Sequence, residues 1–298
     1  MCIRDRIEAD EYDTAFFDKR AKLIHYSPEV LIINNLEFDH GDIYSNLNEI
    51  QKQFHNLIRT MSSEDCIVFP GDDKNIREVL DLGVWSKEVE FGIEGNSSNY
   101  FEAIKKDHSS VRFSINKKVV EINWNLLGEH NARNAITALL ALQHFNLSLS
   151  DSVKSLESFS GVKKRLETII DRKDLKLFDD FAHHPTAIQE TLKGLRARYL
   201  NNRIIALIEI RSNTMKSGLH DKNLTRATSE ADLVFWKGPD KDQLNNLVNK
   251  SPEKNYVIDS VDSFSDELKS SIIKDNDVII MMSNGSFDGL ADLLCSKL

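Results

Sequence analysis

The sequence predicts an α/β protein in which a parallel sheet with a small antiparallel sheet is followed by a Rossmann-like domain. Short aliphatic runs alternate with segments of helical periodicity in both halves of the chain, as in parallel sheets with helical crossovers. From residue 88 to residue 124 the apolar period changes to two, which is typical of antiparallel strands with one solvated face. At about 150 residues per domain, the 298 residues allow two domains.

The first half begins with a predicted β-α-β unit. Residues 30–33 and 66–69 are short aliphatic runs, which predict buried strands. An apolar stripe at steps of three and four residues predicts the helix between them; its members are Ile43, Leu47, Ile50, Phe54, Leu57, Ile58 and Met61. Antiparallel strands are then predicted at 89–93, 111–115 and 120–124, with turns at 95–96 and 116–117. Helices are predicted at 131–142 and 150–156.

The second half repeats strands and helices after a predicted hinge at 158–161. Residues 166–170 and 176–178 predict a hairpin, and parallel strands are predicted at 204–208, 233–236, 256–258 and 278–282. The dinucleotide-binding motif Gly-x-Gly-x-x-Gly does not occur in the sequence. We expect an ATP-binding domain at 7–159 and a Rossmann-like domain at 160–298.

Composition favours a cytoplasmic protein with small-molecule partners. The net charge is −9 and no stretch concentrates lysine and arginine, so we expect no nucleic-acid partner. No apolar run reaches the ~20 residues of a membrane span, and no signal peptide is visible, so we expect no membrane partner. The three cysteines are widely separated, which fits neither a zinc site nor a disulfide framework. Cys66 and Cys295 are expected to be core thiols.

The amino-terminal hexapeptide is unlike the rest of the chain. Residues 1–6 run into the acidic segment at 7–11 without a helix cap or a linker. We expect residues 1–6 to be a non-native leader joined to a truncated protein, and we leave them out of the fold prediction.

An acidic and imidazole-rich segment, residues 179–184, lies between an aliphatic run and a predicted helix. In open α/β sheets this junction exposes backbone donors and is where ligands bind. A simple helix start, with Pro185 at the first helical position, is the alternative. We favour a functional site, because a helix start needs neither the two carboxylates nor the two histidines.

Three other polar segments follow predicted strands or open a helix. Residues 8–13 and Asp39-His40 could bind a divalent cation if adjacent strands bring them together, or they could simply be solvated. The segment 128–134 could contact a heterocycle, or Asn131 could be an ordinary helix cap. Arg165, beside the hinge, is a phosphate candidate because a guanidinium forms paired charge-assisted hydrogen bonds.

Taken in order, five motifs resemble the Mur ligase family. They are Glu-Ala-Asp-Glu from residue 8, Asp-His at 39–40, Gly-Glu-His-Asn-x-x-Asn from 128, Arg-Leu-Glu from 165 and Asp-Asp-Phe-Ala-His-His-Pro from 179. The resemblance implies an ATP-dependent ligase of peptidoglycan biosynthesis and recycling. ATP phosphorylates the lactyl carboxylate of UDP-N-acetylmuramate, and an amine attacks the acyl phosphate to give an amide, ADP and phosphate.

The resemblance also implies roles for particular residues. Glu8 and His40 would hold Mg²⁺, and the nucleotide would meet His130, Asn131, Asn134, Arg165 and Asp180. The amino substrate would meet His183, Arg211, Ser212 and Asn213, and Ser283 and Asn284 could line the same pocket or form a glycine turn. Glu8, His40, Asp180 and His183 would be the catalytic set.

Three stretches, at 8–18, 35–40 and 211–216, favour L-alanyl-γ-D-glutamyl-meso-diaminopimelate as the amino substrate. One alternative is a family member that ligates another amine, such as L-alanine, or a cyanophycin- or folate-type ligase. Another is a non-catalytic module that binds nucleotide or muropeptide.

The sequence departs from the family pattern in several places. The phosphate-binding Gly-Lys-Thr-Thr segment and the UDP-binding domain do not occur, and both would precede Glu8. We therefore expect the 298-residue chain to be inactive alone; ligation by the purified chain would contradict this. His55 stands near the position where several relatives carry a carbamylated lysine, although a half-buried helix histidine is the simpler interpretation. Ile210 replaces an expected proline.

Overall fold

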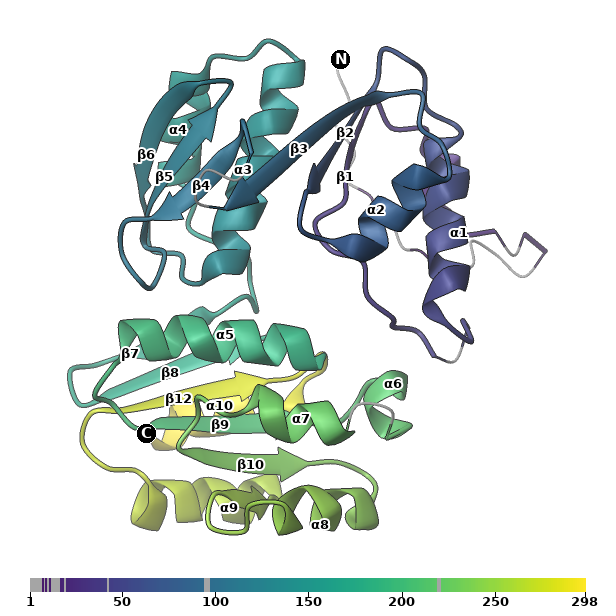
Figure 1. The fold of residues 1–298 in the computed structure, drawn as a ribbon. Helices are drawn as coiled ribbons and strands as arrows, with labels where there is room; N and C mark the ends of the chain where they lie inside the picture. The colour runs from purple at the N-terminus through teal and green to yellow at the C-terminus, as the bar shows by residue number, and fades with distance from the viewer. Residues whose placement is uncertain are drawn as a thin grey trace, which may run out of the picture. The chain divides into compact units, whose positions relative to one another are not determined.

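The computed structural model describes residues 7–298 apart from positions 8, 10, 12–16, 19, 42, 94–96, 219 and 220. The chain forms two compact units (Figure 1). The first comprises residues 1–102, 111–123 and 132–158, and the second comprises 103–110, 124–131 and 159–298. Two loops of the first half of the sequence therefore belong to the second unit. Each sheet has six strands in the described part of the chain.

The first unit opens with the predicted β-α-β unit. β1 (Val30–Ile32) and β2 (Cys66–Pro70) are parallel, and α1 (Leu47–Ile58) connects them. α1 starts at a cap: Asn46 accepts a hydrogen bond from the Glu49 amide at 3.2 Å, and the Glu49 side chain accepts one from the amide of Ser45, the residue before the cap, at 2.8 Å. A short 3₁₀ helix (Lys22–His25) precedes β1.

Three details of this unit differ from the predictions. β1 is an edge strand among the described residues, so Ile32 is 40% exposed rather than buried. The predicted apolar stripe of α1 includes Ile43, but the helix begins only after its cap at Asn46. Ile43 therefore lies outside α1 and is 42% exposed. Met61 also lies beyond the helix, although it packs in the core beneath it.

The strands from β3 onward combine parallel and antiparallel pairing. β3 (Lys87–Ile93) is parallel to β2, because α2 (Lys74–Asp81) forms a crossover between them; the antiparallel prediction for this strand was wrong. β4 (Tyr100–Ala103) was not predicted and pairs with the end of β3. A two-residue turn at Asn116 and Lys117, with φ of 50° and 67°, joins β5 (Ser110–Ile115) to β6 (Lys118–Asn123) in a hairpin. The predicted turn at 95–96 lies outside the described residues.

α3 (Glu129–His144) and α4 (Leu149–Glu157) complete the first half of the chain. Both helices were predicted, and α3 begins two residues earlier than expected. Cys66 is buried in β2 as predicted, but Cys295 is exposed, because it lies on the outer face of the last helix.

The second unit is a Rossmann-like sheet in the order β11-β10-β9-β12-β8-β7. The hairpin of β7 (Glu167–Asp171) and β8 (Leu175–Asp180) is antiparallel, as predicted. The other strands are parallel; they are β9 (Ile204–Glu209), β10 (Leu233–Lys237), β11 (Asn255–Val257) and β12 (Asp277–Met282).

Helices cover both faces of this sheet. The apolar residues of α5 (Pro185–Arg198), α7 (Asp221–Ala227) and α8 (Lys241–Asn249) pack on one face. Those of α9 (Val261–Glu267), the π turn Leu268–Ile272, the 3₁₀ turn Phe287–Gly289 and α10 (Leu290–Lys297) pack on the other. The central strands β9 and β12 are consequently buried on both sides, which explains their continuous apolar runs. A short helix, α6 (Asn213–Lys216), follows β9.

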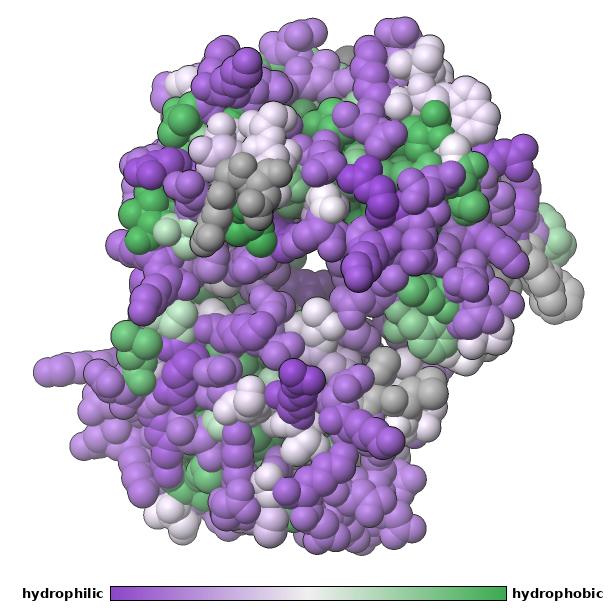
Figure 2. All heavy atoms as spheres, in the orientation of Figure 1, coloured by the Kyte–Doolittle hydropathy of each residue, from purple (hydrophilic) through white to green (hydrophobic). Residues whose placement is uncertain are grey.

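The surface drawn in Figure 2 is predominantly hydrophilic, and its apolar residues form small separate groups. None of the described helices combines the length and the apolar character that a membrane span requires.

Candidate active site

The candidate site of the second unit lies where its parallel strands end. β8, β12, β9 and β10 run in one direction, so their carboxyl ends share one edge of the sheet. Asp180 ends β8, Ser283 follows β12 and Arg211 lies just beyond β9. The structure therefore brings these three predicted residues to the edge at which α/β sheets bind ligands.

Asp180 holds a strained turn. Its carboxylate is 5% exposed and accepts hydrogen bonds from the backbone amides of Leu166 at 2.7 Å and Ala182 at 2.8 Å. The Phe181 amide donates to the Lys164 carbonyl at 2.7 Å. Lys164 and Leu166 have φ of 56° and 51°, a conformation that costs free energy in residues with a side chain. Asp180 thus fixes the turn that carries Arg165.

Arg165 is exposed and presents a guanidinium at this edge. Its guanidinium lies over the Phe181 ring, 5.1 Å from the centroid, and forms no ion pair with any described residue. The His183 ring meets the Phe181 ring edge-on at 5.2 Å, and its Nδ1 is 2.8 Å from the Phe181 carbonyl. Phe181 therefore orients both Arg165 and His183, which is consistent with a phosphate-binding cation held by stacking.

The structure also contains the helix start that was the alternative interpretation of this segment. The His184 side chain caps α5 by accepting from the Thr186 amide, and Pro185 occupies the first helical turn. The simple helix-start interpretation thus accounts for His184 and Pro185, whereas Asp180 and His183 have contacts that a cap does not require.

Burial raises the pKa of both Asp179 and Asp180, with the backbone hydrogen bonds of Asp180 opposing the effect there. A carboxyl group whose pKa is raised in the folded state binds its proton more tightly there than in the unfolded chain. Stability therefore falls as the pH rises from the unfolded value, about 3.9, through the folded one. Asp179 accepts no side-chain hydrogen bond from the described residues, and the positive charges of Lys164 and Lys163 offset the cost of its burial only in part.

The variant Asp179→Asn is expected to become more stable than the wild type as the pH rises from 3 to 7. The reason is that asparagine carries no charge to be desolvated. Urea unfolding followed by circular dichroism across this pH range checks the result. A stability difference that does not change with pH would contradict it.

A second group of predicted residues opens α3. Gly128 has a φ of +86°, and its amide donates to the Asp107 carbonyl at 2.9 Å. Asn131 lies inside the helix and its Nδ2 donates to the Leu127 carbonyl at 2.7 Å, so the interpretation of Asn131 as the helix cap is wrong. The same Nδ2 lies 3.1 Å from Nε2 of His130.

The surroundings of His130 favour the neutral form of its imidazole. Burial lowers its pKa, with nearby Glu190 opposing the effect. An Nε2 that accepts from Asn131 places the ring proton on Nδ1. Nδ1 is buried and has no hydrogen-bond partner among the described residues. A buried unpaired donor is costly, and it marks His130 as a residue with an unfilled interaction.

The variant Gly128→Ala is expected to lose about 2–3 kcal/mol of stability. A Cβ there would lie 2.8 Å from Cε1 and Nδ1 of His130, and the left-handed backbone costs roughly 1–2 kcal/mol in addition. The matched control is Gly289→Ala, since Gly289 has a φ of +76° and open space around the new atom. Thermal unfolding measures both, and equal losses would contradict the role of the His130 contact.

Asn134, a predicted residue of the first unit, has a neighbour that the sequence did not indicate. Asn134 accepts a hydrogen bond from Nδ2 of Asn34 at 2.7 Å, and Oδ1 of Asn34 is buried without a partner among the described residues. Asn34 lies two residues beyond the end of β1, so its place near a strand end was the available signal.

The predicted cation site is only partly covered by the structure. Nε2 of His40 lies 2.9 Å from Oε1 of Glu11 in the acidic segment, but Glu8 lies outside the described residues. No three histidine, cysteine, aspartate or glutamate side chains converge within the described part of the chain. These residues supply two donors, so Mg²⁺ binding stays a prediction. His55 is half-buried on α1, and its Nδ1 has no described partner.

A pocket of about 320 Å³ lies beyond the ends of β9 and β10. We call it the β9–β10 pocket. Its charged lining residues are Glu209, Arg211, Lys216, Lys237 and Asp288. Of the predicted residues Arg211 lines it directly, and the Ser212 hydroxyl caps α6 by accepting from Met215 at 3.2 Å. Asn213 is exposed on the same helix.

The loop after β12 borders this pocket. A Cβ on Gly285 would lie 2.6 Å from Nη1 of Arg211, so the guanidinium rests against the glycine backbone. The Lys164 ammonium donates to the Gly285 carbonyl, and the Ser283 hydroxyl donates to Glu209. Oδ1 of Asn284 is buried without a described partner. The loop therefore connects the Asp180 turn with the β9–β10 pocket and is more than a glycine turn.

Sequence reasoning missed Glu209, Lys237 and Asp288. The first two end aliphatic strands, where a charged residue is out of place in a buried run, and this signal could have found them. Asp288 has no such mark in the sequence, because its pairing with Lys237 depends on the tertiary fold.

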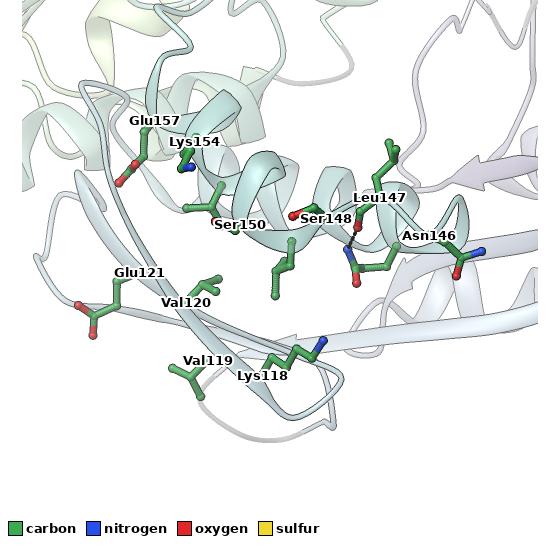
Figure 3. A pocket seen from close by; sticks show the side chains of 13 residues that line it. Lys118, Val119, Val120, Glu121, Asn146, Leu147, Ser148, Ser150, Lys154 and Glu157 are labelled. Carbon is green, nitrogen blue, oxygen red and sulfur yellow. Dashed lines mark hydrogen bonds between the residues drawn. The ribbon is translucent and has the colours of Figure 1, made fainter.

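A larger hollow of about 870 Å³ lies on the first unit between β6 and α4 (Figure 3). Exposed side chains of β6, the α3–α4 loop and α4 border it, including Lys118, Glu121, Lys154 and Glu157. None of the predicted site residues lines it. The smaller β9–β10 pocket differs in that the buried carboxylate of Glu209 lines it at a strand-end edge.

Comparison with known proteins agrees with the motif order. The Mur ligase middle domain matches residues 7–142, and the domain described as "Mur ligase, glutamate ligase domain" matches residues 164–285. A Haemophilus influenzae protein named UDP-N-acetylmuramate–L-alanyl-γ-D-glutamyl-meso-2,6-diaminoheptandioate ligase is 39% identical over 297 residues, 98% of this chain and 65% of that protein. An Escherichia coli protein of the same name is 38% identical over 98% of this chain and 64% of its own length.

The crystal structure of a murein peptide ligase, Mpl, from Psychrobacter arcticus has the same fold. It superposes with a TM-score of 0.70 at 37% identity, over 97% of this chain and 61% of that one. The chain thus spans just under two thirds of the length of these relatives.

Proposed function

Because this chain belongs to the Mur ligase family, we propose that it acts in the ATP-dependent ligation of UDP-N-acetylmuramate to L-alanyl-γ-D-glutamyl-meso-diaminopimelate. The observation that carries the proposal is the 39% identity, over nearly the whole chain, to a relative named for this reaction. The product would re-enter peptidoglycan synthesis, so the reaction belongs to recycling. The cytoplasmic location stays a prediction from composition.

The chemistry requires anions to approach one another. The γ-phosphate of ATP passes to the lactyl carboxylate, ADP leaves, and the amine of the tripeptide displaces phosphate from the acyl phosphate. Cations must neutralise the charge that develops, and water must be excluded. When bound, Mg²⁺ supplies part of that positive charge, and we propose Glu8 and His40 as its ligands.

Arg165 supplies a cation from the protein. We propose that its guanidinium binds the nucleotide phosphates and that Asp180 acts through it. Both oxygens of Asp180 accept backbone amides of the Arg165 turn and the segment after β8, so its contribution is to position Arg165. His130, Asn131 and Asn134 are proposed to meet the adenine, since each has an amide or imidazole that can pair with a heterocycle.

The β9–β10 pocket is proposed to receive the tripeptide. Arg211 suits a peptide carboxylate because its planar fork can donate two charge-assisted hydrogen bonds. His183, Ser212, Asn213, Ser283 and Asn284 are proposed to complete the wall of this site.

The proposal is tested by amine selectivity. The aligned 297 residues of the H. influenzae relative are replaced with this chain, and product formation is followed by mass spectrometry with the tripeptide or with L-alanine. We expect ATP-dependent product with a kcat/KM at least about tenfold higher for the tripeptide. A preference for L-alanine would favour another ligase of the family. ATP binding without any product would favour a binding module.

A further inference from the structure

The start of α3 is tied to two strand-end loops of the first unit. Asn34 lies in the loop after β1, and Asp72 lies in the loop after β2. Nδ2 of Asn34 donates to Oδ1 of Asn134 at 2.7 Å. The guanidinium of Arg133 donates to both carboxylate oxygens of Asp72, at 3.2 and 2.9 Å. Two adjacent residues of one helix are therefore held by two different loops.

The two loops are also joined to each other. The Leu36 amide donates to Oδ2 of Asp73 at 3.3 Å, and Nδ2 of Asn75 donates to the Leu36 carbonyl at 2.7 Å. Hydrogen bonds thus connect the loop after β1, the loop after β2 and the start of α3 in a closed ring. We call this set the α3 ring; its members are Asn34, Leu36, Asp72, Asp73, Asn75, Arg133 and Asn134.

The ion pair in the α3 ring fixes a direction as well as a distance. A guanidinium that makes two hydrogen bonds to the two oxygens of one carboxylate is restrained in its plane. Hydrogen bonds from Arg133 lower the pKa of Asp72, and burial opposes this effect. The side chain of Arg133 is 22% exposed and that of Asp72 is 59% exposed. A partly solvated pair contributes little free energy, so we expect it to act mainly on the geometry of α3.

The amide pair in the α3 ring leaves Asn134 with donors to offer. Asn134 is exposed, and its Nδ2 donates to no residue that the structure describes. Oδ1 of Asn34 is buried without a described partner, so the hydrogen bond to Asn134 is what orients the Asn34 amide. Each of the two amides therefore sets the plane of the other, and the position of α3 decides whether they meet.

We propose that Asn34, Asp72 and Arg133 are positioning residues for nucleotide binding, because they hold the Asn134 amide in the orientation that meets the base. The inference rests on the proposed function, which assigns Asn134 to the adenine, and it adds how the protein holds that amide in place. Since the three residues act through Asn134, their substitution weakens recognition of the base and spares the binding of the phosphates.

Two ligands separate this role from a general loss of structure. Isothermal titration calorimetry measures the binding of ATP, and of tripolyphosphate, which has no base, to the H. influenzae chimera. In Asn34→Ala and Arg133→Met we expect ATP to bind about tenfold more weakly, with the affinity for tripolyphosphate within about twofold of wild type. The KM for ATP should rise by the same factor while kcat stays within about twofold, as for a loss of uniform binding.

A double-mutant cycle tests whether the ion pair acts as a unit. Asp72→Asn and Arg133→Met should weaken ATP binding by similar factors, and the double variant should bind no more weakly than either single variant. Arg112→Met is the matched control, because Arg112 donates Nε and Nη2 to Glu121 elsewhere in the same unit. It should leave both affinities unchanged. Thermal unfolding checks that each variant is folded.

Wild-type ATP affinity in Asn34→Ala and Arg133→Met, equal weakening of ATP and tripolyphosphate, or a chimera that binds no ATP would overturn the inference. Additive losses in the double variant would overturn the role of the ion pair. The titrations need no turnover, so their result is independent of the ligation experiment. A chimera that shows the expected losses but forms no amide would contradict the proposed function and leave the positioning roles standing.

Discussion

Asp180→Ala will lower the free energy of unfolding by about 2–4 kcal/mol and the kcat/KM of ligation by at least about 100-fold. The stability loss follows because the amides of Leu166 and Ala182 lose their acceptor in a buried site, at roughly 1–3 kcal/mol for each unsatisfied group. The activity loss follows because the turn with positive φ at Lys164 and Leu166 is then free to relax, which moves Arg165 away from the phosphates.

Urea unfolding of the 298-residue chain measures the first effect, and phosphate release by the chimera measures the second. Asp180→Asn should fall between wild type and Asp180→Ala, because its amide oxygen can accept one of the two hydrogen bonds. The matched control is Asp179→Asn, which should be as stable as the wild type or more so at pH 7. A wild-type stability for Asp180→Ala would show that the turn does not depend on this carboxylate.

Arg203→Met will destabilise the chain by about 3–5 kcal/mol without changing tripeptide affinity. Arg203 donates to both carboxylate oxygens of Asp277, at 3.0 and 2.6 Å, and Asp277 is 2% exposed. Removing the arginine leaves a buried carboxylate without its cation. The pair lies at the amino ends of β9 and β12, the edge of the sheet opposite to the site.

The double variant Arg203→Met/Asp277→Leu should recover part of this loss, since no charge is then left buried. Recovery will be incomplete, because the Lys274 amide donates to Asp277 at 2.8 Å and loses its acceptor. Chemical denaturation of the three variants checks the order. A double variant less stable than Arg203→Met would contradict the explanation by an uncompensated charge.

The sequence predicted the parallel strands β2, β9 and β12 well, because every residue of these strands is buried and they read as apolar runs. It failed for β3, whose alternation of apolar and polar residues is that of a strand with one exposed face. That alternation reports burial and says nothing of the direction of pairing. β4 was missed because four residues, Tyr100–Ala103, are too few to show a period.

The residues of the site could be predicted in part. Asp180, Arg211 and Ser283 follow strands, and parallel strands place such residues together. The way in which Asp180 acts could not be predicted, because its partners are backbone amides that any sequence presents. Glu209 was overlooked for a related reason. A single carboxylate after five aliphatic residues looks like an ordinary strand end, and only the tertiary structure shows that it is buried without a cation among the described residues.

The transfer of oxygen from the acid to phosphate tests the central claim most directly. UDP-N-acetylmuramate labelled with ¹⁸O in the lactyl carboxylate is incubated with ATP, the tripeptide and the H. influenzae chimera that carries this chain. The account predicts one ¹⁸O atom in the released phosphate for each amide formed, and none in ADP. Amide formation without label in the phosphate, or no amide at all, would contradict it.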